Sequence, residues 1–132
     1  MATTYFITPY DPILWKDEYS LGGTSTLVID FQNFSQAAKL KWPSYESYPY
    51  FSWSISFDDD SEVSGGFSGQ GNQILALDKP VSAIHFNQFV VWYRSYIASE
   101  HKLFLFVEGS WDSLELTNET TENEVGQFIG IN

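Results

Sequence analysis

The sequence predicts an α+β fold, in which an antiparallel sheet of about five to seven strands carries two main helices on one face, with a short helix near the C-terminus. Several segments alternate apolar and polar residues, which is typical of strands with one buried and one solvated face. Two longer segments repeat apolar residues every three to four positions, as amphipathic helices do. Because strands cluster beside helices without regular βαβ alternation, we expect the helices on one face of an antiparallel sheet.

The chain is long enough to form one hydrophobic core. It has 132 residues, of which 43% are hydrophobic and 18% aromatic, far from the composition of a disordered chain. A domain of this size buries roughly two-thirds of the surface that its unfolded chain exposes. No internal repeat and no linker-like tract divides the sequence, so we expect a single globular domain over residues 1–132.

The first part of the chain predicts two strands. The segment 3–10 (TTYFITPY) is rich in residues that favour strands, and a proline interrupts it. In the segment 26–31, Leu27, Ile29 and Phe31 occupy alternate positions, which suits a strand with one buried face. We therefore expect both strands to precede the first helix.

Three helices are predicted from apolar spacing and capping residues. The first spans about 31–42 and the second about 80–98. The second has so broad an apolar face that we expect it to be covered on more than one side. This face comprises Phe86, Phe89, Val90, Tyr93 and Ile97, with Val81, Ile84 and Trp92 on a second flank. A short third helix covers about 120–130. The candidate N-caps are Asp30 or Asn33, Asp78 or Ser82, and Thr120 or Thr121.

The remaining segments predict a strand meander and a hairpin. In the segment 50–57 (YFSWSISF), apolar residues alternate strictly with serines. Gly65 and Gly66, inside the next strand, indicate a bulge or a close approach of backbone. The further strands are expected at 62–69 and 73–77 with turns at 58–61 and 69–72, followed by a hairpin over 102–117 with its loop at 108–112.

Charge is the strongest compositional signal. Six basic residues against seventeen acidic ones leave a net charge of −11. Nucleic-acid binding needs clustered Lys and Arg, which this chain lacks, and anionic membranes are disfavoured for the same reason. A basic protein is the natural partner, while the alternative is that acidity serves only solubility.

Further exclusions follow from the sequence. The chain has no cysteine, which excludes disulfides, thiolate metal sites and a cysteine nucleophile. No signal peptide and no run of about 20 apolar residues is visible. We therefore expect a cytoplasmic protein, with a bacterial source.

The acidic, glycine-rich stretch 57–72 resembles an ion-binding or phosphate-binding loop only in composition. Asp58, Asp60 and Glu62 occupy alternate positions, as the ligands of a calcium loop do, but Val63 stands where that loop needs glycine. The glycines match neither of the common phosphate-binding patterns. We therefore expect turns here, and no metal or cofactor site.

The two histidines give little support to catalysis. His85 lies among apolar residues of the helix 80–98, where a packed, hydrogen-bonded side chain is commoner than a catalytic base. His101 is expected in solvent. We predict no catalytic residue, although a pocket that held His85 beside a carboxylate would favour a small enzyme.

Aromatic side chains crowd into the segment 42–53 (WPSYESYPYFSW). Exposed Tyr and Trp side chains can stack on sugars or anchor a protein partner. The alternative is that these side chains complete the core. Trp111 lies in an expected loop, where burial is less assured.

Our leading hypothesis is a non-enzymatic protein–protein interaction module that binds a basic partner without a cofactor, with a homodimer as a possible state. In size, charge and lack of catalytic motifs the chain resembles small acidic proteins that antagonise a basic partner, such as bacterial immunity proteins. The alternatives are a small-ligand or carbohydrate binder that uses the segment 42–53, and a divergent small enzyme. The expected partner contacts are Asp58, Asp59, Asp60, Glu62, Trp42, Tyr45, Tyr48 and Trp111.

Overall fold

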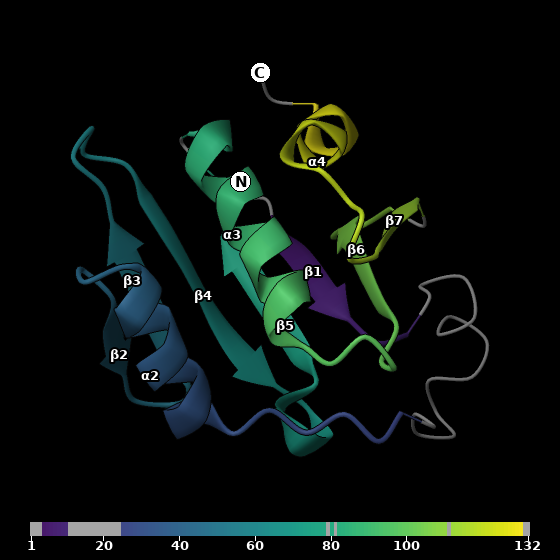
Figure 1. Cartoon of the computed structure of the whole chain (residues 1–132), viewed down its shortest axis with the longest axis horizontal. Coiled ribbons are helices and arrows are strands. Elements are labelled where there is room, and N and C mark those ends of the chain that lie inside the picture. Colours follow the sequence, from purple (N-terminus) through teal and green to yellow (C-terminus); the bar gives the residue numbers. More distant parts are fainter. Residues whose placement is uncertain (1–3, 11–24, 79, 81, 111, 131–132) are drawn as a thin grey trace.

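The computed structural model describes residues 4–10, 25–78, 80, 82–110 and 112–130. Within these residues it contains one seven-stranded antiparallel sheet and three α-helices (Figure 1), which confirms the expected fold class. The strands are β1 (Thr4–Thr8), β2 (Glu46–Tyr48), β3 (Ser52–Ser56), β4 (Glu62–Ser68), β5 (Ile74–Asp78), β6 (Leu103–Val107) and β7 (Ser113–Leu116). The helices are α2 (Phe31–Lys41), α3 (Ala83–Tyr96) and α4 (Glu122–Ile129), and η2 (Gln70–Asn72) is a short 3-10 turn.

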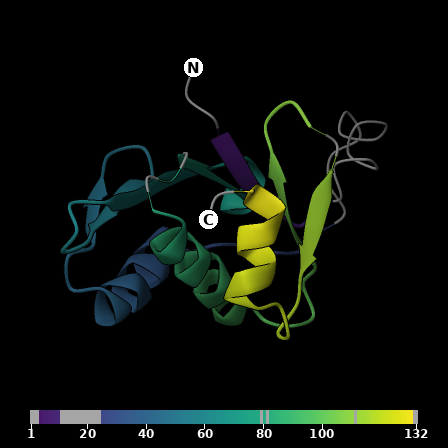
Figure 2. The ribbon, with the colours of Figure 1, turned by 90° about the horizontal axis from the view of Figure 1, so that it is seen from above.

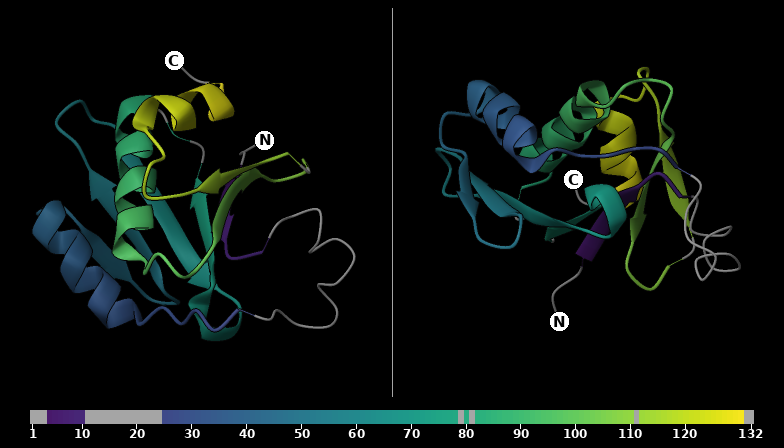
Figure 3. Two further views of the ribbon diagram at one scale, coloured as in Figure 1. Left: turned by 45° about the vertical axis from the view of Figure 1, so that its right-hand side comes forward. Right: turned by 90° about the horizontal axis from the view of Figure 1, so that it is seen from below.

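The sheet has the strand order β2-β3-β4-β5-β1-β6-β7, and every neighbouring pair is antiparallel. The helices lie on one side of it, and the sheet bends so that β6 and β7 flank α4 (Figures 2 and 3). Because the strands alternate in direction, the β3–β4 turn, the end of β5 and the β6–β7 turn all lie at the same end of the sheet. We call this the β3–β4 end.

The core lies between the helices and the inner face of the sheet. Phe34 of α2 is fully buried against Trp53 of β3, with 5.6 Å between ring centroids. Phe89 of α3 packs on the same Trp53 ring at 4.9 Å. Rings of this size supply most of the buried apolar area in a small core, so the two main helices are fixed on the sheet through shared aromatic contacts.

Gly65 sits where two strands and a core ring come closest. It pairs with Trp53 on β3 and with Leu77 on β5 in continuous register. A Cβ atom on Gly65 would lie 2.4 Å from the Ala76 carbonyl oxygen and 3.2 Å from the Trp53 ring. The expectation of a close backbone approach is therefore confirmed, without a bulge.

The prediction of a strand at 26–31 was wrong. Leu27 and Ile29 are buried as their alternation requires, but this segment forms no strand. The Gln73 side chain donates from Nε2 to the Ser25 carbonyl at 3.1 Å and to the Leu27 carbonyl at 2.7 Å. The Ile29 N–H donates to the Gly71 carbonyl at 2.8 Å. A side-chain amide and a turn thus satisfy backbone groups that a neighbouring strand would otherwise pair.

Other expectations need smaller corrections. The short edge strand β2 was not predicted, because its three residues are all exposed and carry no apolar alternation. On α3, Ile84 is 65% exposed instead of widening the covered face, and Val81 lies outside the described residues. Each of the three helices begins at a predicted N-cap, although the Ser82 side chain makes no capping hydrogen bond at α3. The Asp30 carboxylate accepts from the Asn33 N–H at 3.0 Å, and Thr121 forms a reciprocal capping box with the third helical residue of α4.

Candidate functional site

A surface hollow of about 490 Å³ lies between the end of α2, the β3–β4 turn and the start of α3. We call it the α2–β3 hollow. It collects side chains from three elements that are distant in sequence, and they differ in chemistry: aromatic rings, hydroxyls, carboxylates and one imidazole. The lining residues are Trp42, Pro43, Ser44, Ser56, Phe57, Asp58, Asp59 and His85.

The turn after β3 places the carboxylates of the hollow. The Phe57 N–H donates to the Ser61 carbonyl at 3.0 Å, and the Asp60 N–H donates to the Phe57 carbonyl at 3.1 Å. Asp60 has a left-handed backbone with a φ of 64°, which Asp tolerates better than most residues. This tight turn holds Asp58 and Asp59 beside the first turn of α3.

Asp59 and His85 lie next to each other in the lining of the hollow. His85 Nε2 lies 3.3 Å from Asp59 Oδ2, and the imidazole stacks on Phe57 with 3.8 Å between ring centroids. Asp59 Oδ1 accepts hydrogen bonds from the Ser61 hydroxyl and, at 3.0 Å, from the Ser61 N–H. These Ser61 bonds, followed by the nearby His85, lower the pKa of the Asp59 carboxyl. Asp59 is therefore an anion at neutral pH.

The opposite wall of the hollow is built by the end of α2. Trp42 is the C-cap residue of that helix, and its ring contacts Phe89 and Trp92 at centroid distances of 5.8 and 5.1 Å. The next segment is tied to β3, because the Ser44 hydroxyl donates to the Ser56 carbonyl at 2.7 Å. Both contacts hold the wall in a fixed position relative to the β3–β4 turn.

Three of the eight predicted partner contacts, Trp42, Asp58 and Asp59, meet in this hollow. Asp60 and Glu62 lie close by in sequence on the exposed turn and at the exposed start of β4. The sequence analysis did not predict a role for Phe57 or Ser61. It also did not predict which carboxylate lies next to His85.

The remaining predicted contacts lie elsewhere. Tyr45 is 3% exposed, its hydroxyl bonds to that of Ser35 at 2.7 Å, and burial raises its pKa. Tyr48 is 46% exposed on the edge strand β2. Trp111 lies outside the described residues. Since Trp53 is also buried, the segment 42–53 does not present one continuous aromatic surface.

Acidic residues recur along the β3–β4 end of the sheet, from the hollow to the β6–β7 turn. They come from three strands and two turns, which the antiparallel order places at the same end of the sheet. Asp78, at the end of β5, accepts a hydrogen bond from the Ser64 hydroxyl at 2.6 Å. Among the described Lys and Arg residues, Lys39 and Lys41 are the closest in sequence to a residue that lines the hollow. Both lie in the last turn of α2. The acidic residues are Glu46, Asp58, Asp59, Asp60, Glu62, Asp78, Glu108 and Asp112.

No helix among the described residues is long and apolar enough to cross a membrane. In the same residues, no three His, Asp or Glu side chains are grouped so that they could hold a metal ion. In comparisons with protein-family models, curated proteins and solved structures, nothing matches this chain.

Proposed function

We propose that the protein is a non-enzymatic interaction module that receives a lysine or arginine side chain of a basic partner protein in the α2–β3 hollow. The observation that carries this proposal is the composition of the hollow, where the carboxylates of Asp58 and Asp59 lie beside the rings of Trp42 and Phe57. Aromatic rings attract cations through their electron-rich faces, and carboxylates add charge-assisted hydrogen bonds. Together they select a long cationic side chain.

Electrostatics outside the hollow supports the same partner. The net charge is −11, and further acidic residues lie along the same end of the sheet as the hollow. Such a field raises the rate at which a basic partner arrives, whereas the contacts inside the hollow determine how slowly it leaves. The proposal includes a cytoplasmic location, which cell fractionation can test.

The first test concerns the association rate. A partner captured with the tagged protein at roughly 0.1 M salt, and lost at about 1 M, is identified and its binding kinetics are measured. Reversal of three exposed acids (Asp58→Lys, Asp60→Lys and Glu62→Lys) is expected to slow association about tenfold at low salt and to change dissociation less. A control variant, Glu100→Lys with Glu119→Lys, reverses two charges away from the hollow, and its effect is compared with that of the triple variant per charge reversed. An unchanged association rate in the triple variant would refute the steering role.

The second test separates the hollow from the surrounding field. Asp58→Asn removes one charge from the hollow and keeps the shape of the side chain, so dissociation is expected to accelerate about tenfold. Asp60→Asn, on the same turn but not lining the hollow, is the control. Equal dissociation rates for both variants would show that the hollow holds no partner side chain.

A small enzyme is the second candidate, because one observation favours it. A carboxylate next to an imidazole, as in Asp59 and His85, is the arrangement that orients a general base. However, the nearby Ser44 hydroxyl donates to the Ser56 carbonyl and not to His85, so His85 does not activate Ser44 as a nucleophile in this arrangement. His85→Gln distinguishes the candidates: loss of any hydrolytic activity toward ester and phosphoester substrates, with partner binding kept, would favour the enzyme.

A further inference from the structure

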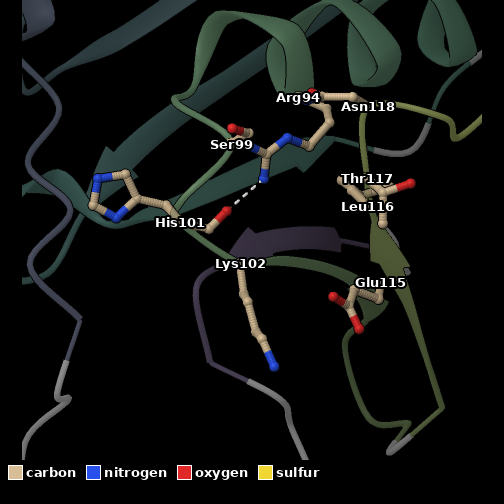
Figure 4. Close-up of a pocket in the computed structure, with 8 residues that line it drawn as sticks. All are labelled: Arg94, Ser99, His101, Lys102, Glu115, Leu116, Thr117 and Asn118. Atoms are coloured by element: carbon tan, nitrogen blue, oxygen red, sulfur yellow. Dashed lines mark hydrogen bonds between the residues drawn. The ribbon is translucent and has the colours of Figure 1, made fainter.

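A second cavity, of about 170 Å³, lies where α3 ends (Figure 4). It is formed by the connection from α3 to β6 and by the end of β7, away from the α2–β3 hollow. Most of its lining side chains are polar or charged. The lining residues are Arg94, Ser99, His101, Lys102, Glu115, Leu116, Thr117 and Asn118.

Arg94 is a buried cation at the wall of this cavity, with 3% of its surface exposed. Its guanidinium donates to the carbonyls of His101 at 2.7 Å, Ala98 at 2.8 Å and Ile97 at 3.0 Å. These bonds satisfy carbonyls that follow the helix end. The Arg94 Nε–H has no partner, and no carboxylate forms an ion pair with this guanidinium within the described residues.

A buried charge without a counter-charge is unfavourable. Carbonyl dipoles compensate Arg94 in part, but they carry no net negative charge. A guanidinium stays protonated at neutral pH. The positive charge of Arg94 therefore attracts an anion that enters the cavity.

Lys102 adds a second cation. The structure describes four Lys and Arg residues, and two of them line this one cavity, in a chain with a net charge of −11. Glu115 also lines it, and its side chain lies on the same side of Arg94 as Lys102 in Figure 4. No ion pair joins Glu115 to either cation within the described residues. Two cations against one carboxylate leave the cavity with an excess positive charge.

The geometry points to a binding site for a small oxyanion, a carboxylate or phosphate group, in this cavity. Arg94 supplies a fixed positive charge at the inner wall, and Lys102 supplies a second cation. Ser99, Thr117 and Asn118 offer hydrogen-bond donors that complete the shell of an oxyanion. This site is independent of the α2–β3 hollow and of the proposed partner.

The test is a titration of the isotope-labelled whole chain with sodium phosphate and, separately, sodium acetate, followed by proton–nitrogen correlation spectra at constant ionic strength set with chloride. We expect saturable shifts of the Arg94 Nε–H signal and of the amides of Ser99, Lys102 and Asn118. The anion that saturates at the lower concentration identifies the ligand class. Shifts that grow linearly with both anions would overturn the proposal.

Arg94 also supports the helix end, so variants of its neighbours carry the mutational test. Lys102→Gln is expected to weaken the affinity for the better anion at least about fivefold, and Thr117→Val is expected to weaken it less. Lys41→Gln, an equal loss of charge on exposed α2, is the control. Equal affinities in Lys102→Gln, Lys41→Gln and the natural chain would also overturn the site.

Discussion

Tyr50 and Phe51, at the turn between β2 and β3, both have a left-handed backbone, with φ values of 64° and 61°. This conformation costs an L-residue roughly 1–2 kcal/mol. Phe51 offsets part of that cost, because its ring packs edge-on against Phe31 and its carbonyl accepts a hydrogen bond from Phe67. Tyr50 is 94% exposed and has no comparable contact among the described residues, so its strain is uncompensated.

Tyr50→Asn is therefore expected to raise the free energy of unfolding by about 0.5–1 kcal/mol, because Asn tolerates the left-handed region. Urea denaturation followed by tryptophan fluorescence measures the change. Tyr50→Ala is the matched control, since it removes the same ring without this tolerance. If both variants were equally stabilised, ring removal and not backbone strain would be the cause.

Asp59 links stability to pH. Its folded-state pKa is lowered by Ser61 and His85, and the unfolded value is about 3.9. Its contribution to stability is thus fully present above about pH 5 and is lost as the pH falls through the lower, folded-state value. Asp59→Asn is expected to flatten the loss of stability in acid.

Thermal unfolding at a series of pH values between about 5 and 2 measures this effect. Asp58→Asn is the control, because no hydrogen bond reaches the Asp58 side chain within the described residues. If the two variants lost stability in acid with the same slope, the Ser61 bonds would not be the source of the linkage.

At the scale of elements, the neighbouring glycines of β4 are expected to behave differently. A Cβ atom on Gly65 would meet the Ala76 carbonyl oxygen at 2.4 Å, whereas one on Gly66 would find its nearest atom, the Phe51 carbonyl oxygen, at 3.6 Å. Paired backbone in the middle of a sheet cannot move away without losing hydrogen bonds. Gly65→Ala is therefore expected to destabilise the fold by about 2 kcal/mol or more.

Gly66→Ala serves as the control and is expected to change stability by about 0.5 kcal/mol or less. Chemical denaturation of both variants provides the measurement. A similar loss for the two substitutions would indicate that general strand flexibility, and not the contact with β5, determines the effect at Gly65.

Local patterns predicted most elements, because the information lies within the elements themselves. Apolar spacing located α2 and α3, and capping residues located α4. Long-range pairing was not visible in the same way. The burial of Leu27 was predictable from alternation, but its backbone partner is the side chain of Gln73, and no short-range pattern links these positions. The edge strand β2 was not predicted for a different reason, because its three exposed residues carry no apolar alternation.

At the scale of the whole molecule, the candidate site illustrates the same limit. The acidic turn and the aromatic segment were recognised from composition, but their meeting with His85 depends on how α3 crosses the sheet. Only the antiparallel strand order shows that Glu46, Asp78 and Glu108 lie at the same sheet end as the acidic turn. The sequence therefore predicted the kinds of residue at the site, while the fold determined which of them meet.

The central position of β1 has a further consequence, for how the protein is made. β1 pairs with β5 on one side and with β6 on the other, so it joins strands that leave the ribosome long after it. Both edges of β1 are paired only after residues beyond 100 have been synthesised. Pairings between residues so far apart in sequence slow folding. A nascent chain arrested between β5 and β6 would carry β1 with one open edge, ready to accept a strand from a second chain. The hazard of strand exchange in this protein is therefore concentrated in the interval of synthesis between those two strands.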